Sequence, residues 1–235
     1  MKRALLFVLL VAAPLSAQDL ITGVQDNSFL LEEAYNQDPG VVQHINLFTR
    51  DRDAHSWAYG FTQEWPVGSI KHQLSYTIPV SDSNLGDVAI NYRYQLVGDG
   101  ESKLAIAPRL TVILPTGEDS DATGVQAGIP ISRVLGSRVI AHTNLGATWF
   151  NHGIDAQYFA GQSVVFAISP RVNALVEALW TGSSGDDELV ISPGIRWAYN
   201  FKSGLQVVPG IAYVMGDDND AVLLYLSFEH PFRKQ

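Results

Sequence analysis

From residue 41 to residue 230, apolar and polar side chains alternate along short segments separated by turn-forming residues. Successive side chains on a strand point to opposite faces, so each segment presents one apolar and one polar side. Most segments have roughly the ten residues that a tilted strand needs to cross the hydrocarbon of a bilayer. The pattern predicts twelve strands: 41–49, 55–65, 69–79, 85–97, 103–114, 123–133, 138–150, 157–168, 171–181, 188–200, 204–215 and 221–230.

The predicted fold class is all-β, a transmembrane antiparallel up-and-down barrel of about 12 strands, with 10 or 14 also compatible with the pattern. In 171–181, for example, Val172, Val176 and Trp180 share one face, while Asn173 and Glu177 share the other. A soluble sandwich with one wet face would show the same alternation. The alternation alone therefore leaves a membrane barrel and a soluble sandwich open.

Two further features favour the membrane barrel. Tryptophan lies close to predicted strand ends at every occurrence, as in the aromatic girdles at membrane interfaces: Trp57, Trp65, Trp149, Trp180 and Trp197. The connections also alternate in kind: those after even-numbered segments are brief, and those after odd-numbered ones are mostly longer and acidic. Short periplasmic turns and longer external loops are typical of outer-membrane barrels, and an even strand count places both chain ends on the periplasmic side.

Proline disturbs the pattern at several points. Pro108, Pro193 and Pro209 fall in the middle of predicted strands, where proline cannot donate to the ladder, so each predicts a bulge or a local break. Segment 123–133, which contains Pro130, is the weakest of the twelve.

The first seventeen residues read as a secretory signal peptide. Lys2 and Arg3 precede an apolar run over 4–13, and small residues precede a cut before Gln18. Removal of those two cations takes the formal charge from −9 to −11, which disfavours nucleic acid as a partner. The chain contains no cysteine, so backbone pairing and burial must stabilise it without disulfides. The expected location is the outer membrane of a Gram-negative bacterium.

Residues 18–40 lie between this signal peptide and the barrel of 41–235. Ser28 is placed to cap a helical turn over 29–34, which Pro39 and Gly40 would end. Two interpretations are open: a flexible periplasmic lead-in, which we favour, and a small plug or gate.

The polar strand faces collect charged and amide side chains that a closed barrel would turn into one lumen. The predicted pore-lining residues are Glu64, Lys71, Arg93, Lys103, Arg109, His142, Asn144, Glu177 and Arg196. They could line a narrow selective channel, or they could form a salt-bridged polar core that conducts nothing. Barrel size does not decide, because eight strands leave room only for side chains and sixteen leave an aqueous channel.

Other chemistry finds little support. The acidic loops could bind divalent cations, but a solvated acidic rim is the preferred interpretation, and we predict no metal site and no cofactor. Outer-membrane phospholipases, which are also twelve-stranded barrels, place the nucleophilic serine two residues after the histidine. Here His142 is followed by Asn144 at that spacing, so an enzyme is not expected.

One stretch resembles a known family. Leu85-Gly86-Asp87 opens a strand that carries Arg93, and Pro108 to Leu114 leads into Pro115-Thr116-Gly117. This pattern resembles the family called MetA-pathway of phenol degradation, over about Gly60 to Thr148. The resemblance implies an outer-membrane barrel with a transport role, associated by name with aromatic compounds.

The predicted function is passive or facilitated passage of a small solute that the sequence does not identify, with an apolar or aromatic one suggested by the family. A non-conducting structural or adhesive barrel is the alternative. The expected partners are outer-membrane lipid, lipopolysaccharide and the barrel-assembly machinery, and association into a homo-oligomer stays open.

Overall fold

The computed structural model describes residues 24, 26–82, 84–118, 120–217 and 220–232, and the predicted signal peptide lies outside them. Within these residues, fifteen strands form one antiparallel sheet. They are β1 (Val41–Asp51), β2 (Trp57–Val67), β3 (Ser69–Ser81), β4 (Asn84–Leu85), β5 (Val88–Tyr94), β6 (Leu104–Ile106), β7 (Arg109–Leu114), β8 (Gly124–Val134), β9 (Val139–Phe150), β10 (Gln157–Ser169), β11 (Val172–Ser183), β12 (Asp186–Trp197), β13 (Tyr199–Asn200), β14 (Gln206–Met215) and β15 (Asp220–Pro231).

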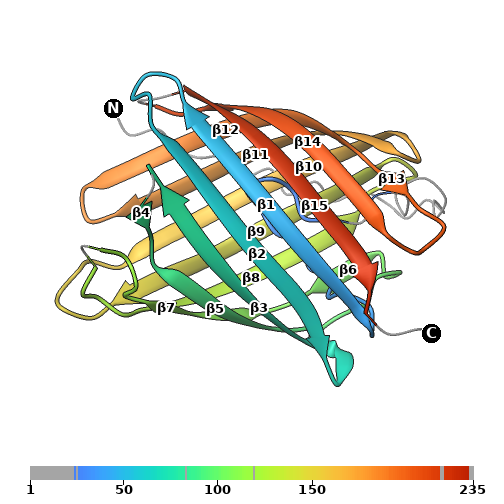
Figure 1. Cartoon of the computed structure of the whole chain (residues 1–235), viewed down its shortest axis with the longest axis horizontal. Helices are drawn as coiled ribbons and strands as arrows, with labels where there is room; N and C mark the ends of the chain where they lie inside the picture. Colours follow the sequence, from blue (N-terminus) through green and yellow to red (C-terminus); the bar gives the residue numbers. More distant parts are fainter. Residues whose placement is uncertain (1–23, 25, 83, 119, 218–219, 233–235) are drawn as a thin grey trace.

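The sheet closes on itself. β1 pairs with β15 over its whole length, and β12 pairs with β14, so the neighbours run around a complete ring. Figure 1 shows the resulting cylinder with its strands strongly tilted. Three crossings are each made of two strands, namely β4 with β5, β6 with β7 and β12 with β13, which leaves twelve crossings in all. The predicted twelve-stranded barrel is confirmed.

The short connections also agree with the sequence. Gly68 alone joins β2 to β3, and its φ of 72° is one that glycine adopts without the steric cost of a side chain. Two residues join β10 to β11, whereas nine separate β7 from β8. Segment 123–133, the weakest in the pattern, is a full-length strand, β8, and Pro130 lies within it.

The prolines act in two ways. Ala107 and Pro108 separate β6 from β7, and the Pro108 carbonyl accepts from Tyr94 N at 2.9 Å. Pro193 and Pro209 lie inside β12 and β14, where the ladder between the two strands keeps only four paired positions. Proline lacks the N–H that a ladder needs, so few residues pair between β12 and β14. The predicted break at Pro108 is confirmed, whereas β12 and β14 continue through Pro193 and Pro209. The break in 188–200 lies after Trp197 instead, and 85–97 is broken after Leu85.

The two faces of the wall differ as expected. On β11, Val176 is 51 % exposed, while its neighbours Leu175 and Glu177 are fully buried. Large apolar side chains are exposed on the outward positions of the neighbouring strands as well, among them Leu145, Phe166, Ile191 and Ile211. A band of exposed apolar side chains around a closed barrel is the surface that meets lipid. Among the described residues, no helix is long and apolar enough to span a membrane.

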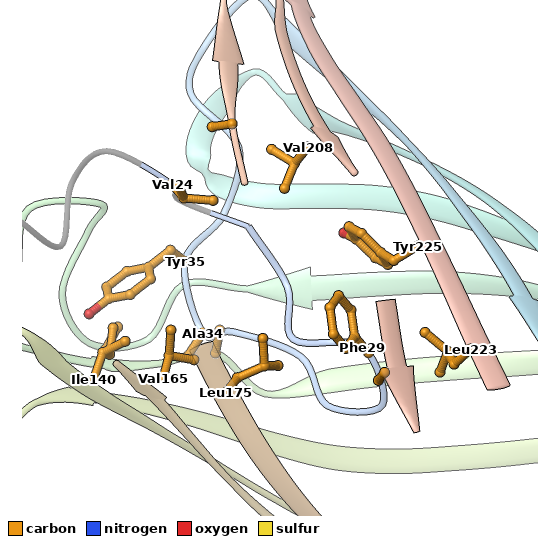
Figure 2. Close-up of a cluster of buried hydrophobic side chains, with 14 residues drawn as sticks. Val24, Phe29, Ala34, Tyr35, Ile140, Val165, Leu175, Val208, Leu223 and Tyr225 are labelled. Carbon is orange, nitrogen blue, oxygen red and sulfur yellow. The ribbon is translucent and has the colours of Figure 1, made fainter. Parts of the chain in front are cut away.

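The flexible lead-in favoured for residues 18–40 is wrong for the part that the structure describes. Residues 26–37, the luminal segment, are buried or half-buried, and the chain becomes exposed only at Asp38 and Pro39. The expected helical turn over 29–34 is absent, and these residues form bends and extended chain. The buried apolar cluster of the protein forms around this segment, and Figure 2 shows Phe29 beside Tyr225. The centroids of these two rings are 5.2 Å apart.

Candidate functional site

The luminal segment is held by side chains that project inward from most of the wall. Its backbone has no ladder of its own, so its polar groups must find other partners or lose the hydrogen bonds they make to water. The partners come from positions far along the chain, on β3, β5, β8, β9, β11 and β12 among others, which surround the segment from all sides. The site is therefore a filled lumen, bounded by the wall and closed by residues 26–37.

Glu177 holds the middle of the segment. Its Oε1 accepts from Leu30 N at 2.9 Å and from Leu31 N at 3.0 Å, and its Oε2 accepts from Phe29 N at 3.1 Å. Three consecutive N–H groups thus converge on one carboxylate. Hydrogen bonds to a charged group are each stronger than neutral ones, by roughly a factor of two. This carboxylate is therefore the principal anchor of residues 29–31.

Two amide side chains act as substitutes for a neighbouring strand. Asn144 accepts from Glu32 N and donates to Glu32 O, both at 2.9 Å. Gln95 accepts from Asn36 N at 2.9 Å and donates to Ala34 O at 2.7 Å. An amide offers one acceptor and two donors, so it can pair with a peptide as another peptide would. Asparagine and glutamine on inward positions thus satisfy an irregular chain at two points.

Arg93 reaches the segment from β5. Its guanidinium donates to Tyr35 O at 2.7 Å, to Glu33 O at 2.9 Å and to Asn36 Oδ1 at 2.9 Å. It also lies 3.5 Å from Glu32 Oε2 and 4.0 Å from Glu64 Oε2. The planar guanidinium supplies several donors in fixed directions, which suits a bend with several carbonyls facing one point.

Arg196 and Arg109 hold the two flanks. Arg196 donates to the carbonyls of Asp26 and Asn27, and Arg109 forms an ion pair with Glu32. Three of the buried side-chain atoms in the described residues lack a hydrogen-bond partner: Asp26 Oδ2, Ser192 Oγ and Arg196 Nε. Asp26 and Arg196 meet at the start of the segment, and Ser192 is the strand partner of Glu177.

Glu33 lies on the luminal segment, outside the strands that cross the membrane. Burial raises the pKa of its carboxyl from 4.5 to about 8, because desolvation and the nearby Asp26 outweigh the attraction of Arg196 and Arg93. The carboxyl is therefore mostly protonated at neutral pH. A neutral carboxyl avoids most of the cost of placing a charge in the lumen.

Glycines on inward positions make room for the bulky side chains of the segment. A Cβ on Gly210 would lie 2.6 Å from the Phe29 ring, and one on Gly194 would lie 2.5 Å from it. A Cβ on Gly161 would lie 2.4 Å from the Leu31 side chain. These three positions on β10, β12 and β14 form the hollow in which Phe29 and Leu31 are seated.

The structure brings together seven of the nine residues predicted to line a pore. Six of these contact the luminal segment or support residues that do: Glu64, Arg93, Arg109, Asn144, Glu177 and Arg196. His142 shares a 2.7 Å hydrogen bond with Ser132, whose Oγ accepts from Ala34 N at 2.7 Å. Lys71 and Lys103 do not join them, because both are exposed near strand ends on the short-turn side. Their role in lining a pore stays a prediction.

Several contacts were missed by sequence reasoning. Gln95 and Ser132 bind the segment directly, and the glycines of β10, β12 and β14 seat it. Glycine at repeated inward positions was the signal that could have indicated a bulky occupant of the lumen. The five tryptophans all lie close to strand ends on outward positions, and their role as a membrane girdle stays a prediction. Among the described residues, no group of three His, Cys, Asp or Glu side chains could hold a metal ion.

Comparison with solved structures identifies the fold. The NanC porin superposes with a TM-score of 0.61 at 8% identity, covering 79% of this chain and 98% of that one. The KdgM porin in complex with disordered oligogalacturonate gives 0.58 at 7% identity, with 82% and 99% covered. The COG4313 outer-membrane channel from Pseudomonas putida F1 gives 0.58 at 11% identity, with 84% and 97% covered.

The chain has the fold of an outer-membrane porin. At these identities the likeness concerns the fold alone. No protein-family model and no curated protein matches the chain.

Proposed function

We propose that this protein is a gated outer-membrane channel for a small solute, with the luminal segment as its gate. The observation that carries the proposal is the nature of the obstruction. Residues 26–37 have no secondary structure and are held by side-chain hydrogen bonds and by the seating of Phe29 and Leu31. A segment of this kind can leave the lumen without breaking any strand pairing of the wall, whereas a core built from the wall could not.

The outer-membrane location is supported by the apolar outward face of the wall and by its fold. Its outward face carries exposed apolar side chains throughout β8 to β12, and its fold is shared with outer-membrane porins. A polar interior and an apolar exterior in a closed sheet are suited to a bilayer, because a sheet without free edges pairs its backbone groups internally. The surrounding lipid, lipopolysaccharide and the assembly machinery are the partners that such a barrel would meet.

The class of solute is argued from a family resemblance and from a contrast with the KdgM porin. The resemblance around Leu85 to Gly117 to the MetA-pathway of phenol degradation family supports an apolar or aromatic solute as part of this proposal. KdgM was solved with oligogalacturonate, a chain of acidic sugars. The lumen here, on the long-loop side, is lined by Asp186, Asp187 and Glu188, which disfavours an anionic polymer.

A reversible lock tests the gate. Ser28 Oγ of the segment lies 2.8 Å from Ser163 Oγ of β10, so Ser28→Cys with Ser163→Cys can form a disulfide. The chain has no native cysteine to compete. In planar bilayers, or in proteoliposomes loaded with small aromatic solutes, the oxidised pair should stay closed and the reduced pair should open.

A matched control comes from the wall. Thr62 Oγ1 and Thr77 Oγ1 are 2.9 Å apart on β2 and β3 and do not touch the segment. Thr62→Cys with Thr77→Cys should leave conduction unchanged by oxidation. Equal conduction by the oxidised and reduced forms of the Ser28→Cys, Ser163→Cys variant would contradict the proposal that the segment is a gate.

The second candidate is a non-conducting structural barrel. The observation in its favour is the completeness of the packing, because hydrogen-bond partners from six strands and apolar seating fill the lumen around residues 26–37. It predicts no solute passage in either redox form of the double cysteine variant.

A hydrolase role is not part of the proposal. Ser132 and His142 are hydrogen-bonded, as a nucleophile and its base would be. Both are fully buried, and Ser132 Oγ is already bound by Ala34 N. The pair therefore serves to hold the segment, which is the simplest role for it.

A further inference from the structure

A cavity of about 710 Å³ lies between the luminal segment and the long-loop end of the barrel. One end is bounded by Leu30, Leu31 and Glu32 of the segment, and the other by the β11–β12 hairpin tip over 181–188. Small-molecule sites commonly have volumes of about 300–1,000 Å³. The cavity is therefore large enough to hold a small solute on the long-loop side of the luminal segment.

The charges that line the cavity are strongly unequal. Its lining contains five carboxylates, Glu32, Asp186, Asp187, Glu188 and Asp217, and one cation, Arg109. On β12 the buried Ser192 and Arg196 mark the luminal face. Asp186 and Glu188 lie at even spacing from them on the same strand, so they belong to that face. These two carboxylates are therefore directed at the lumen rather than at lipid.

The single cation is already neutralised. Arg109 forms its ion pair with Glu32, and its Nε donates to Thr111 Oγ1 at 3.2 Å. Glu32 is also 3.5 Å from Arg93, which keeps it in place. Within the described residues, no cation forms an ion pair with Asp186 or Glu188. The cavity therefore keeps an uncompensated negative potential.

Apolar surface faces the same space. Leu31, Leu179 and Phe159 line the cavity, and the Phe159 ring lies where a Cβ on Gly146 would be, only 2.3 Å from its Cζ. The absence of a side chain at Gly146 thus allows the ring to approach β9 closely. An aromatic ring also attracts a cation to its face.

We propose that this cavity binds small organic cations, an amine or quaternary ammonium group on an apolar body, in preference to anions of the same size. The cationic group would lie towards Asp186 and Glu188, and the apolar body would lie against Leu31, Leu179 and Phe159. The proposal rests on the proposed function, since it names the solute class that the channel collects above its gate. Clefts with one sign of charge concentrate counter-charged solutes through their focused field.

Equilibrium binding to the full chain in a non-ionic detergent tests it. The probes are benzyltrimethylammonium, benzyl alcohol and benzoate, which share a ring and differ in charge, and calorimetry at low salt is the readout. Benzyltrimethylammonium should bind at least tenfold more tightly than benzoate. Its affinity should fall as salt is added, because exposed charges are screened over a Debye length of about 10 Å at 0.1 M salt.

The variants separate local from overall charge. Asp186→Asn with Glu188→Gln should weaken binding of benzyltrimethylammonium about fivefold at low salt. Asp121→Asn with Asp155→Asn removes the same net charge from loop residues that do not line the cavity, and should leave binding unchanged. Benzoate binding as tightly as the cation would overturn the proposal, as would equal losses in the two variant pairs or equal affinity for benzyl alcohol.

This binding needs no movement of the luminal segment. A barrel that binds the cation but never conducts would defeat the proposed channel and leave the binding preference standing. A barrel that conducts but binds the cation no better than the anion would defeat the binding preference and leave the proposed channel standing.

Discussion

The backbone N–H of Leu31 donates to Glu177 at 3.0 Å, joining two residues that are 146 positions apart in the chain. Glu177→Gln keeps one oxygen but turns an amide N–H₂ towards N–H donors, so at least one of the three hydrogen bonds is lost. A hydrogen bond to a charged group contributes about 1.5–3 kcal/mol. Amide hydrogen exchange at residues 29–31 should therefore quicken by roughly tenfold or more.

Glu188→Gln is the matched control, because it makes the same change on the neighbouring strand, outside the hydrogen bonds to the segment. Exchange at residues 29–31 should stay unchanged in that variant. Equal protection in the Glu177→Gln and wild-type proteins would show that the carboxylate is not the anchor.

Adding one methyl group at Gly210 should unseat the segment. The new Cβ would lie 2.6 Å from the Phe29 ring, closer than two carbons can approach, so the ring must move. Gly210→Ala should raise the frequency of channel opening in planar bilayers, and Gly210→Ala with Phe29→Ala should not raise it beyond Phe29→Ala alone. Gly60→Ala, where no atom lies within 4 Å of the new Cβ, should behave as wild type. Identical openings in Gly210→Ala and Gly60→Ala would contradict the seating of Phe29.

Arg93 and Arg109 should differ in their tolerance of lysine. Arg93 donates to four acceptors of the segment, on Glu32, Glu33, Tyr35 and Asn36, while Arg109 pairs with Glu32 alone among its residues. Lysine keeps the charge but not the planar fork of donors, so Arg93→Lys should loosen the segment much more than Arg109→Lys. Hydrogen exchange over residues 32–36 measures this. Greater exchange in Arg109→Lys would reverse the assignment.

Retention of the segment should weaken as pH rises. The Glu33 carboxyl has a pKa of about 8 when docked, against 4.5 in water. Because the docked pKa is the higher one, docking is strongest below pH 4.5, weakens between 4.5 and 8, and levels off above 8. A nitroxide on Leu30→Cys should gain mobility over this range in electron paramagnetic resonance spectra. Glu33→Gln should flatten the rise, and an unchanged slope in that variant would exclude Glu33 as its source.

A charged substitution on the outward face should destabilise the barrel most near the middle of the bilayer. Val176 lies in the middle of β11 and is 51 % exposed, whereas Ile168 lies next to the end of β10 on the same outer surface. Val176→Arg should lower the free energy of unfolding in lipid by about 2–4 kcal/mol, and Ile168→Arg by about 0–1 kcal/mol. Urea titration of the barrel in lipid vesicles would measure both. Equal costs at the two depths would argue against a bilayer centred on these strands.

The wall could be predicted from the sequence because its signal is periodic. Alternation in segments such as 171–181 depends on the two-residue repeat of a strand, and lipid on one side makes that repeat strict. The broken crossing at Pro108 was also predictable, since proline has no N–H to give. The breaks near Gly86 and after Trp197 were not, because no residue at either place forbids a strand.

The occupant of the lumen was not predictable in the same way. Alternation tells which side chains point inward, but not whether water or protein meets them there. Residues 26–37 show no period, because their polar groups are paired with inward side chains from several different strands. Asn144 and Glu177 were therefore identified as luminal, yet their common partner was not.

The position of the luminal segment in the chain has a consequence for biogenesis. The segment is made before every strand of the wall, but its binding partners include Arg196 on β12 and Tyr225, near the end of the chain. Its complete set of contacts exists only after β15 has joined β1. Among the described residues, the first part of the chain to be synthesised can thus complete its contacts only after the last strand of the wall is in place.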